Sequence, residues 1–498
     1  MSTLIALAVA LPLLGSGVAL VGRDRARIRD SVALVTLIGV TAVAAAILTD
    51  VWRNGPTELL VGGWSSELGI TLVADSLAAM LLLVSFATIL VVEVFAIGQR
   101  STAWGADPRI APPTLLVLTA GVGLAVLSGD LFTLFVSFEL ILVASYVLLT
   151  HRGTRGQLQS GMTYVTMNLV SSGLFLLGVA FVYAATGTVN LRLLAERIPE
   201  LDGGVQAGIG LWFLVVFGTK AAVFPLFMWL PDSYPTAPTT ITAVFAGLLT
   251  KIGVASLIRF HAMTGMDELG PVLLVVAGLT MLVGVAGALA QTDVKRILSF
   301  HIVSQIGYMV LGLGLFSVAG VAGAVLFLIH QIPVKTVLFL VGGLVENDAG
   351  TSKLDAVGGL ASRRPWIAVF FALPALSLAG LPPFSGFVAK LALVDAAIAV
   401  DSTAIAIVAL VGSALTLLSM VKIWAGVFWG EPTEPAEHTD ERPGVRPIMM
   451  SATGLAVAGT LAVAVVAGPL WEMSERAAHE LLSGGDVHLD ADAEEASP

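Results

Sequence analysis

Fourteen long apolar segments divide the 498-residue chain, and they restrict it to one class of structure. A helix needs about 20 consecutive apolar residues to cross the hydrocarbon core of a bilayer. Charged residues make up only 12% of this sequence, against about 25% in soluble domains. The segments have the approximate limits 2–22, 31–51, 70–98, 112–128, 131–150, 160–186, 205–230, 239–264, 270–290, 297–317, 319–345, 365–400, 402–429 and 447–472. The sequence therefore predicts an all-α polytopic membrane protein with about 14 transmembrane helices.

The basic residues between these segments are unevenly distributed. Loops assigned alternately to two sides place fifteen on one side, namely Arg23, Arg25, Arg27, Arg29, Arg100, Arg109, Arg152, Arg155, Lys295, Arg296, Lys353, Arg363, Arg364, Arg442 and Arg446. The other side receives Arg53, Arg192, Arg197, Arg259 and Arg476. Because cytoplasmic loops carry the excess of basic residues, we expect both termini on the non-cytoplasmic side. Acidic residues near the C-terminus predict a solvated, disordered tail over 473–498.

Titratable residues inside the apolar segments are the main functional signal. An ionised side chain at the centre of a spanning helix costs about 2.5–3.5 kcal/mol, so such residues usually face the bundle interior or a water-filled path. The residues near the middle of their segments are Glu139, Lys220, Lys251, His330 and Lys390. They predict a row of polar groups along the membrane plane. Since lysines outnumber acids here, at least one lysine lacks a carboxylate partner and would give up its proton readily.

The row has two interpretations. The groups are either static interhelical salt bridges or members of an ion pathway, and we favour the pathway. Lys422 lies close to the end of its segment, where we expect its side chain to reach the interface. Lys335 follows His330 by five residues, and the sequence leaves open whether it joins the row or pairs locally.

Two segments are interrupted by proline next to a buried lysine. Pro225 follows Lys220 by five residues, and Pro382 and Pro383 precede Lys390. Prolines in a spanning helix free backbone carbonyls that can hold water or ions. The broken segments are the seventh and twelfth, which suggests two inverted five-helix repeats, because an odd number of spans reverses topology. We therefore expect N-terminal helices over 1–111, repeats over 112–264 and 270–430 (spans 4–8 and 9–13), and a last helix within 431–472.

Six ordered blocks resemble a known family. They are "FELILVASYVLL", "GTKAAVFPLFMWLPDSYPTAPT", "LLTKIGVASLIRFH", "DVKRILSFHIVSQIGYMVLGL", "HQIPVKTVLFLVGG" and "LSLAGLPPFSGFVAKLALV". Together they are similar to the antiporter-like membrane subunits shared by Mrp-type cation/proton antiporters and respiratory complex I. The length and the lysine in the twelfth span favour the D-type branch of the Mrp Na⁺/H⁺ antiporter subunits. That family has fourteen helices with two inverted five-helix repeats, which agrees with the segments above.

The resemblance implies roles for individual residues. Glu139 matches the family's fifth-span glutamate and Lys220 the lysine that pairs with it. Lys251, His330 and Lys390 match later members of a proton relay, with Lys390 controlling release to one side. Secondary relay candidates are His301, Lys335, Asp75 and Asp395.

The implied function is that of a proton-translocating subunit of a multi-subunit Na⁺/H⁺ antiporter in a prokaryotic plasma membrane. It would be a transporter subunit, not an enzyme, and would work with other membrane subunits. The chain has no cysteine, which excludes disulfides and cysteine-ligated iron–sulfur clusters, and we expect no cofactor. A hard cation prefers oxygen ligands, for which Asp75 and Asp395 are weak candidates, so we expect a sodium site shared with another subunit. The alternatives are a proton-pumping subunit of an NADH:quinone oxidoreductase or membrane hydrogenase, and a non-conducting scaffold.

Overall fold

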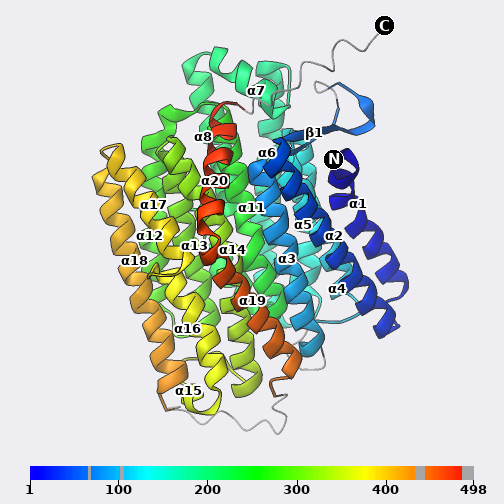
Figure 1. Cartoon of the computed structure of the whole chain (residues 1–498), viewed down its shortest axis with the longest axis vertical. Coiled ribbons are helices and arrows are strands. Elements are labelled where there is room, and N and C mark those ends of the chain that lie inside the picture. The colour runs from blue at the N-terminus through cyan, green and yellow to red at the C-terminus, as the bar shows by residue number, and fades with distance from the viewer. Residues whose placement is uncertain (66–68, 101–105, 432–443, 485–498) are drawn as a thin grey trace.

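The computed structural model describes residues 1–65, 69–100, 106–431 and 444–484. These form one bundle of long helices that run vertically in Figure 1. The N-terminus and the end of the last described helix lie in the upper part of that view, and the short helix α15 lies at the bottom. We call these the upper and the lower end of the bundle.

Helices account for nearly all of the described chain. Their bounds are α1 Ser2–Val21, α2 Ala26–Asn54, α3 Ser76–Gln99, α4 Ala111–Leu127, α5 Leu131–Thr150, α6 Arg155–Thr186, α7 Leu191–Arg197, α8 Gly203–Ala221, α9 Trp229–Ser233, α10 Thr239–Val244, α11 Thr250–Met263, α12 Gly270–Ala290, α13 Val294–Gly314, α14 Val318–Ala349, α15 Leu360–Arg363, α16 Pro365–Ala379, α17 Ser385–Ala399, α18 Thr403–Trp424, α19 Pro447–Val465 and α20 Ala467–Leu482. The strands β1 Thr57–Leu60 and β2 Thr71–Ala74 pair antiparallel at the upper end.

The predicted fold class is confirmed. Twelve stretches of helix in the described residues are long and apolar enough to cross a membrane. The two remaining apolar segments contain α4 and the α16–α17 pair, which are helical but shorter because the chain breaks or turns there. The β1–β2 hairpin was not predicted from the sequence. The division into two inverted repeats remains a prediction.

The last helix differs from the expected boundary. The sequence predicts a disordered tail from residue 473, but α20 continues to Leu482 and packs against α14 and α3. Met473, Ala477 and Leu481 recur at helical spacing and are all buried, so they supply an apolar face despite the charged residues between them. The rest of the expected tail, residues 485–498, lies outside the described residues.

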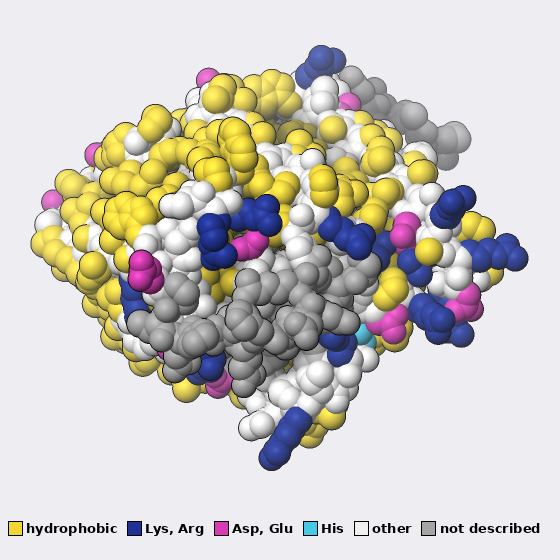
Figure 2. All heavy atoms as spheres, turned by 90° about the horizontal axis from the view of Figure 1, so that it is seen from below, with side chains coloured by type: hydrophobic (Ala, Val, Ile, Leu, Met, Phe, Trp, Pro, Cys, Tyr) yellow, Lys and Arg dark blue, Asp and Glu magenta, His cyan; other side chains and the backbone are white. Residues whose placement is uncertain are grey.

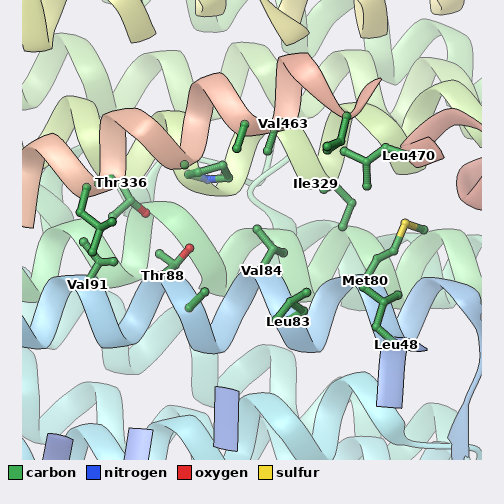
Figure 3. A pocket seen from close by; sticks show the side chains of 17 residues that line it. Leu48, Met80, Leu83, Val84, Thr88, Val91, Ile329, Thr336, Val463 and Leu470 are labelled. Carbon is green, nitrogen blue, oxygen red and sulfur yellow. The ribbon is translucent and has the colours of Figure 1, made fainter. Parts of the chain in front are cut away.

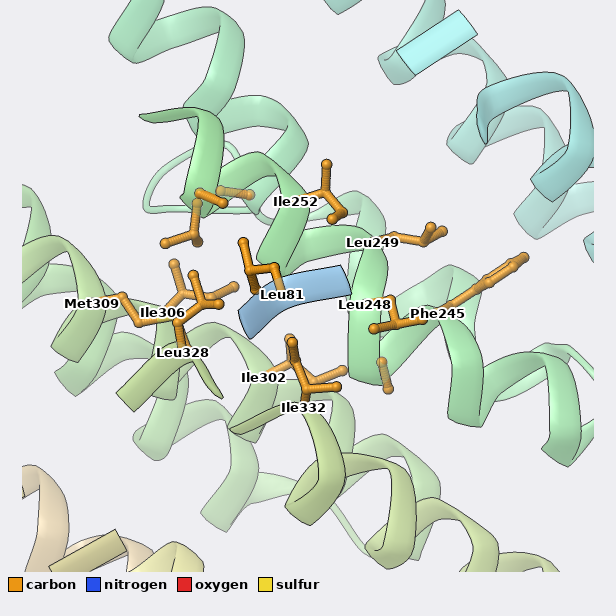
Figure 4. Close-up of a cluster of buried hydrophobic side chains, with 14 of the residues drawn as sticks. Leu81, Phe245, Leu248, Leu249, Ile252, Ile302, Ile306, Met309, Leu328 and Ile332 are labelled. Carbon is orange, nitrogen blue, oxygen red and sulfur yellow. The ribbon is translucent and has the colours of Figure 1, made fainter. Parts of the chain in front are cut away.

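The helices α10–α11, α13 and α14 make the centre of the bundle. In the apolar part of each of these spans, 94–100% of the residues are buried, whereas the share is 33% in the peripheral helices α1 and α2. Figure 4 shows apolar side chains from α11, α13 and α14 meeting Leu81 of α3, among them Ile252, Ile306 and Ile332. All of them are fully or almost fully buried. The residues of the predicted row lie on these same central helices or on their neighbours.

The lower face of the bundle is rich in basic side chains. Figure 2 views this face from below and shows Lys and Arg side chains near its middle and along its right-hand and lower edges. Arg363 and Arg364, beside α15, belong to this end and form ion pairs with Asp348. The distribution agrees with the charge asymmetry counted along the sequence.

Candidate functional site

Four of the five row residues are enclosed by the bundle. The exposed fractions are 6% for Lys220, 1% for Lys251, 0% for His330 and 6% for Lys390. They come from α8, α11, α14 and α17 respectively. Glu139 on α5 is partly exposed at the side of the bundle, but one of its carboxylate oxygens is buried.

Lys220 lies in the last turn of a helix that ends inside the bundle. The helix α8 ends at Ala221 because Ala222 turns into the left-handed region (φ 63°) and Pro225 lacks an N–H. The Lys220 ammonium donates to the Ser172 hydroxyl (3.0 Å) and to the Asn168 carbonyl (3.4 Å) on α6. Glu139 acts on Lys220 through its charge. The buried oxygen of Glu139, its Oε1, has no hydrogen-bond partner among the described residues.

Lys251 lies just after a stretch where the backbone hydrogen bonding changes. A π-turn over Phe245–Leu249 joins α10 to α11 and leaves the Ala246 carbonyl free to accept from the Lys251 ammonium. Gly253, two residues further on, brings α11 against the end of α8. A Cβ there would lie 2.8 Å from the Lys220 carbonyl carbon and 2.7 Å from the Ala221 nitrogen. Glycine is therefore required for the helices carrying Lys251 and Lys220 to approach this closely.

The second half of the row surrounds the break between α16 and α17. The Lys390 ammonium donates to the Leu378 carbonyl (2.9 Å) and to the Ser413 hydroxyl (3.0 Å). These contacts place the ammonium at the negative end of α16, whose last carbonyls have no helical partners. His330 Nδ1 lies 2.8 Å from the hydroxyl of Ser385, the first residue of α17. His330 is thus in direct contact with the start of α17, a contact that the sequence did not indicate.

Lys335 and His301 join this half of the row. Lys335 is fully buried, and its ammonium has no hydrogen-bond partner in the part of the chain that the structure describes. The charges of Lys251 and Lys390 act on Lys335, and Lys335 in turn acts on both histidines. His301 is also fully buried, and its Nε2 lies 2.8 Å from the Ser419 hydroxyl. Whether Lys335 belongs to the relay remains a prediction.

Several buried polar atoms around the row lack hydrogen-bond partners within the described residues. They are Glu139 Oε1, Thr250 Oγ1, His301 Nδ1, Gln305 Oε1, His330 Nε2, both side-chain atoms of Gln331, Lys335 Nζ and Ser377 Oγ. Buried polar atoms in folded proteins are nearly always paired with protein or ordered water. Such a concentration indicates groups that exchange hydrogen bonds with water or with one another.

An apolar stripe runs beside the polar side chains of α13. Ile302 and Ile306 alternate with His301 and Gln305 on α13, and Ile332 follows Gln331 on α14 (Figure 4).

A sizeable cavity lies outside the row. It has a volume of about 410 Å³ and lies between α3, α14 and the α19–α20 segment (Figure 3). Its lining is aliphatic apart from Thr88 and Thr336, and none of the lining residues is titratable.

Two secondary candidates lie away from the row. Asp395 is on α17 but exposed, because five residues after Lys390 the helix has turned to its outer face. Asp75 caps α3 at the upper end and forms an ion pair with Arg259.

Lys422 lies at the helix end, as expected, where its ammonium donates to the carbonyls of Leu289 (2.7 Å) and Gln291 (2.6 Å).

Sequence reasoning missed a buried ion pair near the lower end. Lys295, which the sequence assigns to a loop, has its ammonium 2.6 Å from Glu346 Oε2, and both side chains are 6% exposed. The Thr239 hydroxyl donates to the same oxygen (2.8 Å). Glu346 follows the apolar run "VLFLVGGLV", and this position was the available signal. In the described residues, no group of three or more His, Asp or Glu residues could hold a metal ion.

Comparison with known proteins identifies relatives over nearly the whole chain. Residues 128–416 match the family described as NADH:quinone oxidoreductase/Mrp antiporter, transmembrane. The chain is 39% identical to the D subunit of a Na⁺/H⁺ antiporter of Alkalihalophilus pseudofirmus over 488 residues, 97% of this chain and 98% of that one. It is 36% identical to the corresponding D subunit of Bacillus subtilis over 396 residues, 79% and 80% of the two chains.

Solved structures show the same fold. A chain of the Mrp complex from Dietzia sp. superposes with a TM-score of 0.88 at 34% identity, covering 97% of this chain and 98% of that one. A chain of an archaeal membrane-bound sulfane sulfur reductase gives the same TM-score at 24% identity, covering 96% and 98%, and shows the fold alone.

Proposed function

Because the chain belongs to the NADH:quinone oxidoreductase/Mrp antiporter family, we propose that it is the proton-translocating D subunit of a multi-subunit Na⁺/H⁺ antiporter. The observation that carries this proposal is the enclosure of Lys220, Lys251, Lys335 and Lys390 with two histidines in the centre of a membrane bundle. A bundle held by apolar packing has no need of four buried lysines, since each is costly in hydrocarbon.

The relay would work by changing the stability of each charged lysine. A nearby carboxylate favours the ammonium form, whereas burial and a neighbouring cation favour the neutral amine. Glu139 supports the charge of Lys220, and Lys251 and Lys390 oppose the charge of Lys335. A proton arriving at one lysine therefore promotes release from the next. Moving one charge across 100 mV is worth about 2.3 kcal/mol, which such changes in environment can match.

The helix breaks would provide the polar surroundings. At Lys390 the carbonyl of Leu378 and the hydroxyl of Ser413 hold the ammonium, and at Lys220 Ser172 and Asn168 do the same. These neutral acceptors stabilise the protonated lysine without trapping it in a tight ion pair. A lysine held this way can pass its proton on.

The side of the bundle near Glu139 supports an assembly with other membrane subunits. Phe132, Val136 and Val143 are 42–58% exposed and form a stripe on α5 with Glu139. A carboxylate facing hydrocarbon is unfavourable, so a partner subunit would cover this stripe. The named relatives are subunits of antiporters, and one solved relative is part of an Mrp complex.

The same reasoning orients the protein in a prokaryotic plasma membrane. The basic lower face would be cytoplasmic and both chain termini would lie on the other side. Sodium would bind at a site that includes another subunit. Relatives named as antiporter subunits favour this function over a respiratory proton pump.

The test is proton exchange by the complete complex in inside-out membrane vesicles. Glu139→Gln and Lys220→Ala are expected to lose Na⁺-dependent proton movement, while Lys353→Ala, which removes an exposed lysine, keeps it. If both row variants assemble and exchange normally, the chain is a non-conducting scaffold.

A further inference from the structure

Three charged side chains from separate helices meet at the upper end, where α3 begins. Asp75 caps α3, its Oδ1 accepting from the Ala78 N–H (2.7 Å). Arg259 of α11 places Nη2 2.9 Å from Asp75 Oδ1 and 2.8 Å from its Oδ2. Glu480 of α20 accepts from the backbone N–H of Ser76 (2.9 Å) and from its hydroxyl (2.7 Å). Two carboxylates thus share the positive end of one helix with one guanidinium.

Arg259 separates two small cavities. The upper one, about 30 Å³, is polar and is lined by Glu58, Asp75, Asn190, Arg192, Arg259 and Glu480. The inner one, about 10 Å³, lies between α3, α4, α5 and α11. Apart from Arg259 and Ser256, the residues that line it are apolar, and they include Ile252. Arg259 lines both. A cavity of about 10–15 Å³ holds one water, so each can hydrate a proton-transfer step.

The inner cavity points toward the row. Ile252, at its lower end, is the residue after Lys251, and Leu134 on its α5 side precedes Glu139 by five residues. At 1.5 Å per residue, Lys251 lies about 12 Å below Arg259 along α11. The guanidinium therefore occupies the place where an aqueous route from the upper surface to the row would have to pass.

We propose that Asp75, Arg259 and Glu480 form the upper port of the proton pathway. Glu480 exchanges its proton with the upper solution, and Arg259, held by Asp75, closes the route to Lys251. The inference rests on the proposed function, because a port is needed only if the row moves protons.

The electrostatics of Glu480 suit this role. Glu480 lies at the end of α20, outside the twelve candidate spans. Burial, followed by the negative charge of Asp75, raises the pKa of Glu480 to about 7, while the Ser76 hydrogen bonds and Arg476 act in the opposite direction. The other charged groups lining the upper cavity are Arg259 of α11, Glu58 of β1 and Arg192 of α7.

The sign of the pH effect follows. Below pH 7 Glu480 is mostly protonated, and Asp75 alone holds Arg259. Above pH 7 Glu480 ionises and adds a second negative charge to the cavity that Arg259 also lines. Arg259 is then attracted by two acids, which changes its position or its hold on Asp75 and opens the route.

A purely structural role for the three residues predicts something different. In that case they would only hold α20 onto the start of α3, and their loss would reduce assembly without altering how activity depends on pH. The pH profile of exchange, measured per assembled complex, separates the two roles.

The experiment uses the complete complex in inside-out vesicles, with Na⁺-dependent proton exchange recorded from pH 6 to pH 9. Glu480→Gln is expected to lower exchange about tenfold at pH 8, less than the 10²–10⁴ typical of a lost acid–base group, because Asp75 remains. It should also remove the step in the profile near pH 7. Glu480→Asp should restore both. Glu196→Gln on α7 removes an exposed carboxylate that does not line the cavity, and this matched control is expected to behave like wild type.

The outcomes are distinct. If Glu480→Gln keeps the wild-type rate and profile while Lys220→Ala loses exchange, the port is wrong and the proposed function stands. If Glu480→Gln only reduces the amount of complex, with an unchanged profile, the contact is structural and the port is again wrong. If Lys220→Ala also exchanges normally, the proposed function itself fails.

A second variant tests Arg259 directly. Arg259→Lys keeps the charge but has a shorter side chain, so it is expected to raise Na⁺-independent proton leak. An unchanged leak contradicts the role of Arg259 in closing the route.

Discussion

The ammonium group of Lys390 lies 2.9 Å from the carbonyl oxygen of Leu378, so a lysine on one half of a broken helix caps the end of the other half. The Ser413 hydroxyl accepts from the same ammonium at 3.0 Å. The lysine is thus part of the break itself. Any change in its protonation alters the contact between α16 and α17.

Lys390→Ala is expected to lower Na⁺-dependent proton exchange at least about tenfold, because a positioned proton-transfer group is removed. Ser413→Ala removes one neutral acceptor worth about 1 kcal/mol and should stay within about fivefold of wild type. Exchange in vesicles with equal complex content checks both. A wild-type rate for Lys390→Ala would remove this residue from the relay.

Gly386→Ala is expected to destabilise the complex. A Cβ at Gly386 would overlap the Ser377 carbonyl oxygen on α16 and come within 3.0 Å of His330 Cε1. Overpacking of this kind costs about 1–3 kcal/mol, and here it would also disturb the His330–Ser385 contact. The control is Gly173→Ala on α6, where a Cβ meets nothing within 4 Å. Equal thermal midpoints of the two purified variants would contradict the expectation.

The buried Lys295–Glu346 pair predicts a non-additive pair of substitutions. Removing one partner leaves a buried charge uncompensated, so Lys295→Met and Glu346→Gln should each cost about 3–5 kcal/mol. The double variant should cost much less than the sum. Arg296→Met breaks a half-exposed pair with Asp232 and should cost about 0–1 kcal/mol. The thermal midpoints of the purified variants test this prediction. If Lys295→Met and Glu346→Gln are as stable as Arg296→Met, the buried pair contributes little.

The apolar cluster of Figure 4 predicts a proton leak when one of its residues is made polar. Ile306 is fully buried in the cluster of Figure 4, beside Gln305. Ile306→Thr places a hydroxyl on the residue after Gln305, whose buried Oε1 has no hydrogen-bond partner among the described residues. It should raise proton leak in the absence of Na⁺, at a stability cost of about 1–3 kcal/mol. Val276→Thr on the peripheral helix α12 is the control. A leak that rises equally in both variants would indicate general loosening of the bundle.

Much of the fold was predictable from single segments of the sequence. Fourteen apolar runs coincide with helices because each run, by its own length and composition, must satisfy its backbone internally in hydrocarbon. The two breaks were visible for the same reason, since Pro225 and Pro383 act on their own helix. The end of α20 was misjudged because its apolar face, Met473, Ala477 and Leu481, is interleaved with charged residues.

The candidate site was predictable only in part. Buried lysines stand out in an apolar sequence because each is costly there, and this was enough to select Lys220, Lys251 and Lys390. The partners of buried charges could not be predicted, because they depend on which helices become neighbours. The Lys295–Glu346 pair is 51 residues apart, and Arg259 meets Asp75 across 184 residues.

The sequence by itself therefore determined the membrane class, the number of apolar segments, the helix breaks and the identity of the deep charges, because each follows from the cost of local groups in hydrocarbon. Only the tertiary structure decided that Asp395 faces outward, that Lys335 is fully buried, and that Asp75 and Glu480 share the start of α3. Helix packing sets these relations, and a packing neighbour is not a property of any one segment.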